Sequence, residues 1–188
     1  EAIYYPAKDA IFYSADVHGN QITGERLRCI SRIINHSSTG EGVLTVVTTM
    51  DGIADRLIPV ERFKEAVITL DYSSEIEPEK LAKKLVAMGF VRTGMVEDKG
   101  QFAIRGGIID IFSYTDEAPV RIELWDTEVD SIRMFDVESQ RSIERLQSYS
   151  IFPATEYIFT EDELKNGLYN IKEECDRQLE CFDYGKRK

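Results

Sequence analysis

The chain has 188 residues, 43% of them hydrophobic, which fits one or two small domains with a proper core and argues against wholesale disorder. Its formal net charge of −11 provides no basic footprint for phosphate groups, which argues against direct DNA or RNA binding and against an anionic membrane surface. No apolar run reaches the length of a membrane span.

The first 66 residues alternate between strand and helix patterns. Short β-type segments at 3–5 and 11–13 precede a helix that starts at Thr23, with apolar residues at helical spacing. Residues 43–49 form a β-branched apolar run without alternation, typical of a strand buried on both faces of a parallel sheet. A short helix from Gly52 to Leu57 ends before the next proline. This order predicts part of an α/β layer.

A different pattern covers residues 67–150. After a strand at 67–70, Pro78 and Gly89 delimit a helix whose apolar residues share one face and whose lysines form its solvated side. About five strands follow from Phe90 onward, and the adjacent glycines at 106–107 suggest a bulge or bend. We therefore predict an α+β domain with a mainly antiparallel sheet.

The last segment, residues 151–188, returns to helical patterning. Thr160 to Glu163 is a capping-box sequence, and an apolar stripe runs from Leu164 to Leu179. We expect this stripe to pack on residues 1–66, so that 1–66 and 151–188 form one discontinuous domain into which residues 67–150 are inserted. The end of the chain, 185–188, is expected to fray.

The cysteines and the first residue indicate the setting of the chain. Cys29, Cys175 and Cys181 lie in helical patterns and match no metal-binding spacing. We interpret them as reduced thiols of a cytoplasmic protein, with a structural disulfide as the alternative. The chain starts at Glu1 without a leader, almost directly in a strand-like run, and we expect it to be a piece of a longer protein.

The strand at 120–125 is the most informative segment. Val120, Ile122 and Leu124 share one face, and Arg121, Glu123 and Trp125 share the other. If the aliphatic residues face a core, the indole is exposed beside a charged pair, and Trp and Arg are enriched at binding hot spots. The alternative is that Trp125 sits at a strand end and is capped by a neighbouring loop.

Motifs for catalysis are missing from the sequence. There is no G-x-x-x-x-G-K-[ST] loop, and the glycines after Arg105 precede a strand rather than the helix that would hold a phosphate. The clustered carboxylates lack a nearby histidine and the spacing of a calcium loop; they are Asp110, Glu123, Asp126, Glu128 and Asp130. We expect no catalytic residue, metal site or cofactor site in this chain.

Several long motifs point to a known family. Residues 101–112, which contain RGGIIDIF, and residues 119–142, which end in FDVESQRS, closely resemble bacterial transcription-repair coupling factors, in the amino-terminal region that is similar to the excision-repair protein UvrB. Residues 23–27, 43–49 and 152–156 fit as well, so the resemblance covers nearly the whole chain. The stretch between Tyr13 and Val43 is too short for the long β-hairpin of UvrB itself.

This resemblance implies a function through contact with other proteins. In the family, the inserted domain binds the ATPase UvrA and so recruits nucleotide excision repair to stalled RNA polymerase. ATP, Mg²⁺ and DNA belong to a motor elsewhere in the full-length protein, and a carboxy-terminal domain is thought to cover the docking face. The alternative for this chain is a degenerate nucleotide-binding half-domain, similar to the ATPase domain of UvrB.

The family's docking residues correspond to Arg105, Arg121 and Trp125, and the strand alternation adds Glu123 to the same face. Three positions depart from the family pattern: Trp125 replaces the usual Phe, Ser113 a common Pro, and 126–128 a Gly/Asp-Asp-Glu turn. We therefore expect a non-catalytic docking fragment whose partner-binding residues are these four.

Overall fold

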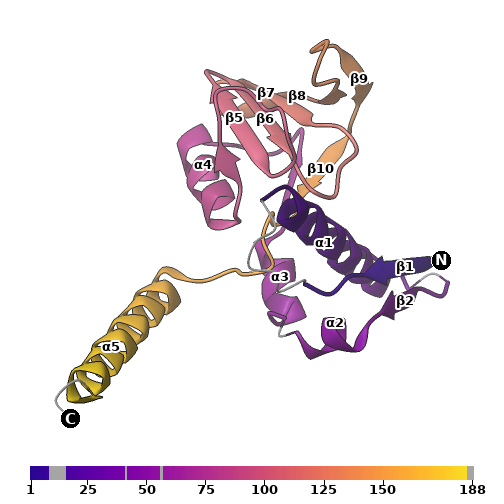
Figure 1. The fold of residues 1–188 in the computed structure, drawn as a ribbon. Helices are drawn as coiled ribbons and strands as arrows, with labels where there is room; N and C mark the ends of the chain where they lie inside the picture. Colours follow the sequence, from indigo (N-terminus) through magenta and orange to yellow (C-terminus); the bar gives the residue numbers. More distant parts are fainter. Residues whose placement is uncertain (9–15, 41, 56, 186–188) are drawn as a thin grey trace. The chain divides into compact units, whose positions relative to one another are not determined.

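A computed structural model describes residues 1–8, 16–40, 42–55 and 57–185, without the side chains of 16–20 and 180–185 (Figure 1). Residues 1–158 form one compact unit, and residues 159–188 form a second. The elements are β1 (Ala2–Tyr5), α1 (Asp16–Thr39), β2 (Thr45–Thr48), α2 (Met50–Ala54), α3 (Val60–Ala66), β3 (Ile68–Asp71), α4 (Pro78–Ala87), β4 (Val91–Arg92), β5 (Gln101–Arg105), β6 (Ile108–Phe112), β7 (Val120–Trp125), β8 (Glu128–Phe135), β9 (Ser142–Arg145), β10 (Ser148–Ile151) and α5 (Glu161–Gly185). The strand expected at 11–13 and the chain end at 186–188 lie outside the described residues.

The first layer contains a parallel pair of strands beside a long helix. β1 pairs with β2 in parallel register, which agrees with the parallel sheet expected for residues 43–49, and α1 lies against β1. Burial of β2 on both faces was a wrong expectation, because the successive residues Val46 and Val47 are both exposed. Within the described residues β1 is the only strand paired with β2, so one edge and much of both faces stay open.

The helical segment after β2 differs from the expected single helix. α2 is capped by Thr49, whose Oγ1 accepts a hydrogen bond from the amide of Gly52 at 3.2 Å. Pro59 then acts as the N-cap residue of α3, which the sequence analysis missed, and Phe63 buries that helix against the core. A proline both stops one helix and permits the start of the next, since its missing amide is not needed there.

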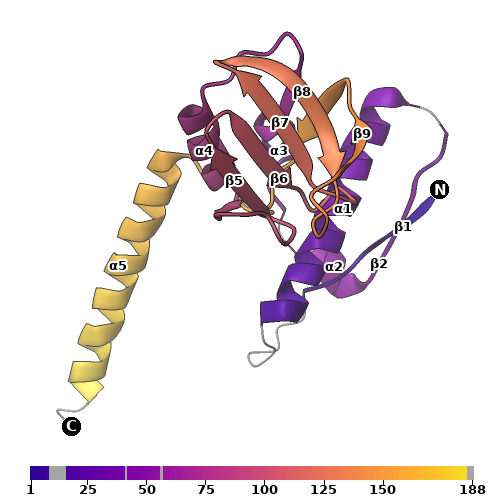
Figure 2. The ribbon, with the colours of Figure 1, turned by 90° about the horizontal axis from the view of Figure 1, so that it is seen from above.

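A six-stranded sheet is the main structure of residues 91–145. Its order is β4-β5-β6-β7-β8-β9, and every pairing is antiparallel except β4 with β5. The expected α/β fold class with a mainly antiparallel sheet domain is therefore confirmed (Figure 2). The glycines at 106–107 form the two-residue turn between β5 and β6, with Gly106 at a φ of +60°.

One face of this sheet is covered by helix α4 and forms the core. Pro78 occupies the first turn of α4, and Leu81 and Leu85 are buried with sheet residues such as Ile109 and Ile122. The strand predicted at 67–70 exists as β3, but it pairs with β10 in a separate two-stranded sheet. Because α4 occupies one face, the opposite face of the sheet holds the polar residues of the alternating strands.

A buried ionic network joins the helical layer to the segment after β10. The Arg26 side chain in α1 is fully buried, and its Nε and Nη2 donate to the two carboxylate oxygens of Glu156 at 2.7 and 3.0 Å. Its Nη1 donates to the carbonyl of Pro6 and contacts Asp55 at 2.9 Å. The network links the two segments, 1–66 and 151–188, that were expected to form one discontinuous domain, and the predicted division at 66/67 and 150/151 stays a prediction.

The second unit is the single helix α5. Its predicted capping box is present, because the Thr160 amide donates to the Glu163 carboxylate at 2.9 Å and the Glu163 amide donates back to Thr160 Oγ1 at 3.2 Å. Its apolar stripe is exposed at Leu164, Leu168 and Ile171. The surface on which this stripe packs stays a prediction.

We predict that Glu156→Ala lowers the free energy of unfolding by about 3–5 kcal/mol, because it leaves the Arg26 guanidinium buried without its main partner. Urea unfolding of both variants measures this loss. The control is Glu138→Ala, which changes an exposed carboxylate and should cost less than about 0.5 kcal/mol. A shift no larger than that of the control would contradict the structural role of this pair.

Candidate protein-docking face

The polar face of the six-stranded sheet brings distant residues into one row. Asp110 lies directly opposite Arg121, Arg121 opposite Arg133, and Arg133 opposite Arg145. Directly opposed residues of neighbouring strands point to the same side of a sheet, and like charges in that arrangement destabilise it. Three arginines in a row therefore need carboxylates between them.

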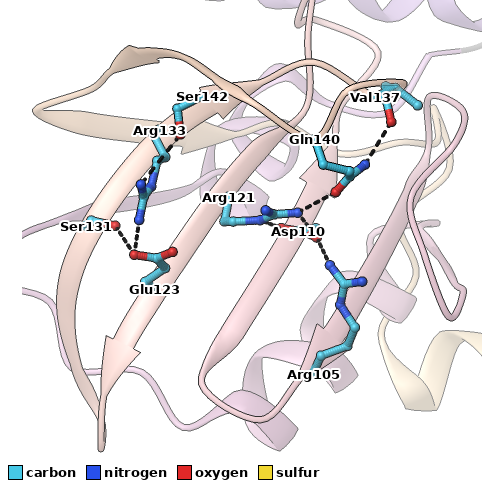
Figure 3. A network of polar contacts seen from close by, with 9 residues as sticks. All are labelled: Arg105, Asp110, Arg121, Glu123, Ser131, Arg133, Val137, Gln140 and Ser142. Atoms are coloured by element: carbon cyan, nitrogen blue, oxygen red, sulfur yellow. Dashed lines mark hydrogen bonds and ion pairs between the residues drawn. The ribbon is translucent and has the colours of Figure 1, made fainter.

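Asp110 provides the first of these carboxylates. Only 1% of its side chain is exposed, and it binds two arginines (Figure 3). Arg121 donates from Nε to Oδ1 at 2.7 Å and from Nη2 to Oδ2 at 2.9 Å, while Arg105 donates from Nη2 to the same Oδ2 at 2.6 Å. A buried carboxylate is tolerated only when it is paired and hydrogen-bonded, so Asp110 fixes both arginines in place.

The Arg121 side chain is held on three sides. Besides Asp110, its Nη2 donates to Gln140 Oε1 at 2.8 Å, and its guanidinium carbon lies 4.3 Å from the ring centre of Phe135. The hydrogen bonds to Asp110 raise the pKa of Arg121 further above its ordinary value, with burial opposing that shift. Only 16% of the side chain is exposed, so Arg121 stabilises the sheet as well as contributing positive charge to its surface.

Glu123 provides the second carboxylate of the row. It accepts hydrogen bonds from Ser131 Oγ, at 2.8 Å, and from Arg133 Nη2 (Figure 3). Burial acts to raise the pKa of Glu123, but the hydrogen bonds from Ser131 and Arg133 outweigh this effect, so the pKa of Glu123 is lower than its ordinary value. Glu123 is therefore ionised and neutralises Arg133.

Trp125 ends β7 at a tight hairpin. It pairs with Glu128 across a two-residue turn in which Asp126 takes a φ of 57°. Alternation along β7 holds, because Val120 and Ile122 are buried while 80% of Trp125 is exposed. The exposed indole predicted from the sequence is thus confirmed, and the alternative of an indole capped by a neighbouring loop is wrong.

The structure brings the four predicted residues onto one sheet but gives them different surroundings. Arg105 and Trp125 are open, with 43% and 80% of their side chains exposed, whereas Arg121 and Glu123 are largely engaged by neighbours. Two guanidinium groups share the single carboxylate of Asp110, so this part of the face keeps surplus positive charge. Their role in partner binding stays a prediction.

Sequence analysis missed the residues that organise this face. Asp110 was considered only as a candidate acid or base, and Gln140, Ser131 and Arg133 were not considered as neighbours of the docking residues. One signal was available: an aspartate in the middle of the apolar strand sequence IIDIF needs a partner, since carboxylates are almost never buried unpaired. Its partner could not be read without the register of β6 with β7.

The described part of the chain also bears on metal binding, membrane spanning and cysteine chemistry. No cluster of three or more potential metal ligands occurs there, and no helix of that part is long and apolar enough to cross a membrane. Cys29 is a free, buried thiol and Cys175 a free, exposed one.

The cleft of about 840 Å³ beside α1 resembles no phosphate site. Three cations and three carboxylates line it, namely Arg28, Arg32, Lys99, Glu25, Asp116 and Glu117. Arg28 already donates to the carbonyl of Tyr114 at 3.0 Å, and Lys99 to that of Asp116. Its charges therefore balance, and two of its cations are used to hold the 114–116 loop.

We predict that Arg121→Ala lowers the free energy of unfolding by about 3–5 kcal/mol, because it removes two bonds from a buried carboxylate. Arg105→Ala should cost about 1 kcal/mol or less, since Asp110 keeps its bidentate partner and Arg105 is half exposed. Urea unfolding compares them directly. Equal losses would contradict the division of roles between the two arginines.

Comparison with known proteins shows which proteins this chain resembles. The family described as "UvrB interaction domain" matches residues 68–157, which contain the whole polar face. The chain is 40% identical over 186 residues to the transcription-repair-coupling factor of Bacillus subtilis, covering 99% of this chain and 15% of that protein. It is 36% identical over 187 residues to that of Staphylococcus aureus strain MRSA252 and 37% identical over 172 residues to that of Staphylococcus haemolyticus.

These matches cover 95% and 92% of this chain but only 16% and 14% of the two staphylococcal proteins. The chain thus spans about one sixth or less of the length of these relatives. The resemblance indicated by its motifs is confirmed: residues 68–157 match the UvrB interaction domain family, and the chain is similar over nearly its whole length to one segment of bacterial transcription-repair coupling factors.

Proposed function

We propose that the chain is a non-catalytic docking module that binds UvrA through the polar face of the six-stranded sheet. In the full-length protein this contact recruits nucleotide excision repair to stalled RNA polymerase. The observation that carries the proposal is Trp125, with 80% of its side chain exposed at the edge of a face of fixed arginines. The match of residues 68–157 to the UvrB interaction domain family supports it.

The indole is suited to anchor a partner. Covering a tryptophan removes roughly 150–250 Å² from water, and it immobilises only two side-chain torsions. Trp125 projects from a hairpin end held by the pairing of β7 with β8, so the backbone beneath it is already ordered. Binding there gains apolar burial at a small entropic cost.

The arginines are suited to select an acidic partner surface. Arg105 has one nitrogen bonded to Asp110 and 43% of its side chain exposed, so its other donors face solvent. Charge-assisted bonds from such donors to partner carboxylates are about twice as strong as neutral ones. Complementary charge between these arginines and partner carboxylates would fix the orientation of the partner.

The remaining partners belong to the full-length protein. RNA polymerase and DNA are contacted by its other parts, and its motor uses ATP and Mg²⁺. Its carboxy-terminal domain covers the docking face until the polymerase is engaged, so that one surface serves two exclusive partners. The setting is the cytoplasm.

We predict that Trp125→Ala and Arg105→Ala each weaken binding to purified UvrA by about 30-fold, the loss expected for a hot-spot truncation of roughly 2 kcal/mol. Isothermal titration calorimetry measures the affinities. The matched controls are Val86→Ala and Lys83→Ala, which remove an exposed apolar and an exposed cationic side chain from α4, on the opposite face of the sheet. They should bind UvrA as the parent chain does.

The same experiment can refute the proposal. Full-strength binding by both Trp125→Ala and Arg105→Ala, with unfolding midpoints equal to that of the parent chain, would remove this face from the UvrA interface. Failure of the unaltered chain to bind UvrA would remove the docking function itself.

A further inference from the structure

The connection between β8 and β9 is a turn built from its own side chains. It contains the motif FDVESQRS at 135–142, which provides Phe135 and Gln140 as neighbours of Arg121. Asp136 Oδ1 accepts hydrogen bonds from the amide and the hydroxyl of Ser139, at 2.8 and 2.6 Å. The amide of Gln140 donates to the Asp136 carbonyl at 2.8 Å, and that of Asp136 to the Arg141 carbonyl at 2.9 Å.

Gln140 occupies a strained position in this turn. Its φ is +57°, in the left-handed region that glycine adopts without cost and that glutamine rarely adopts. Its side chain is held at both ends, because Nε2 donates to the Val137 carbonyl at 2.8 Å and Oε1 accepts from Arg121 Nη2 at 2.8 Å (Figure 3). A strained backbone that supports a two-ended side-chain bridge indicates that the bridge has a use.

The Gln140 side chain stabilises Arg121 at a carboxylate that two arginines share. Two guanidinium groups of like charge, those of Arg105 and Arg121, compete for the same oxygen, Oδ2. Gln140 gives Arg121 a second acceptor on the side away from Arg105 and so opposes its displacement. With Nε and Nη2 engaged, no described residue bonds the remaining nitrogen of Arg121, Nη1.

We infer that Gln140 is a positioning residue for the docking face: it fixes the Arg121 guanidinium so that Nη1 is presented to carboxylates of the partner. The inference rests on the proposed function, since the partner is UvrA. It assigns the motif at 135–142 the role of holding a docking arginine from the turn, while Asp110 holds it from the sheet.

The test uses Gln140→Gly in the 188-residue chain. Glycine suits the left-handed position, so the unfolding midpoint should be unchanged or higher, whereas loss of the bond to Arg121 should weaken UvrA binding about tenfold. Gln140→Met, which keeps the size of the side chain and the backbone strain but has only a weakly accepting sulfur, should weaken binding similarly. The control is Glu138→Gln, an exposed change in the same turn, which should leave binding as it is.

A second readout does not depend on UvrA. In ¹⁵N–¹H spectra of arginine side chains, the Nη protons of Arg121 should exchange with water faster in Gln140→Gly than in the parent chain. Unchanged Arg121 signals would overturn the inference. So would equal UvrA binding by Gln140→Gly, Gln140→Met and the parent chain, and that result would leave the docking function standing. A parent chain that does not bind UvrA would overturn both.

Discussion

The proposed docking face depends on one buried carboxylate. Asp110 has 1% of its side chain exposed, in the middle of a strand whose neighbouring residues fill the core, and it is balanced by Arg121 and Arg105. Removing one partner of a buried ion pair lowers the free energy of unfolding strongly. Replacing the whole pair by apolar residues of similar size often leaves the stability unchanged or raises it. Stability alone therefore does not explain the charge of Asp110. Its better explanation is that it holds the side chains of Arg121 and Arg105 at the surface.

Ordering of the arginines during folding is the functional consequence. A free arginine loses considerable rotamer freedom when it binds, whereas an arginine already fixed by a carboxylate and an aromatic ring loses little. In this chain Arg121 is bonded to Asp110 and stacked on Phe135, and Trp125 extends from the same strand. The face presents an ordered anchor and ordered charge together, which is the combination expected of a hot spot.

Much of this could be predicted from the sequence, because alternation within a single strand is a local property. The inward and outward sides of β7, the helix from Pro78 and the capping box at Thr160 all follow from short patterns and are present. The roles of Asp110 and Gln140 could not be predicted in this way. They depend on strand register and on a turn conformation that brings residues 19 positions apart into contact.

Two expectations for the first layer were wrong, for different reasons. An apolar run such as Val43 to Thr49 reports a preference for strand but not how many neighbours cover it, and β2 has one paired strand among the described residues. Pro59 was interpreted only as a stop signal, although proline also begins helices. At β2 the local pattern was correct and the tertiary context decided the outcome, whereas at Pro59 a local signal for a helix start was overlooked.

The most direct test of the account is cross-saturation from unlabelled UvrA to the deuterated, ¹⁵N-labelled chain, observed at backbone amides and at the indole of Trp125. We expect intensity losses at the indole and along the polar positions of β5 to β8, with the amides of α4 unaffected. Losses confined to α4 or α5, with an unchanged indole signal, would contradict the assignment of this face as the UvrA-binding surface.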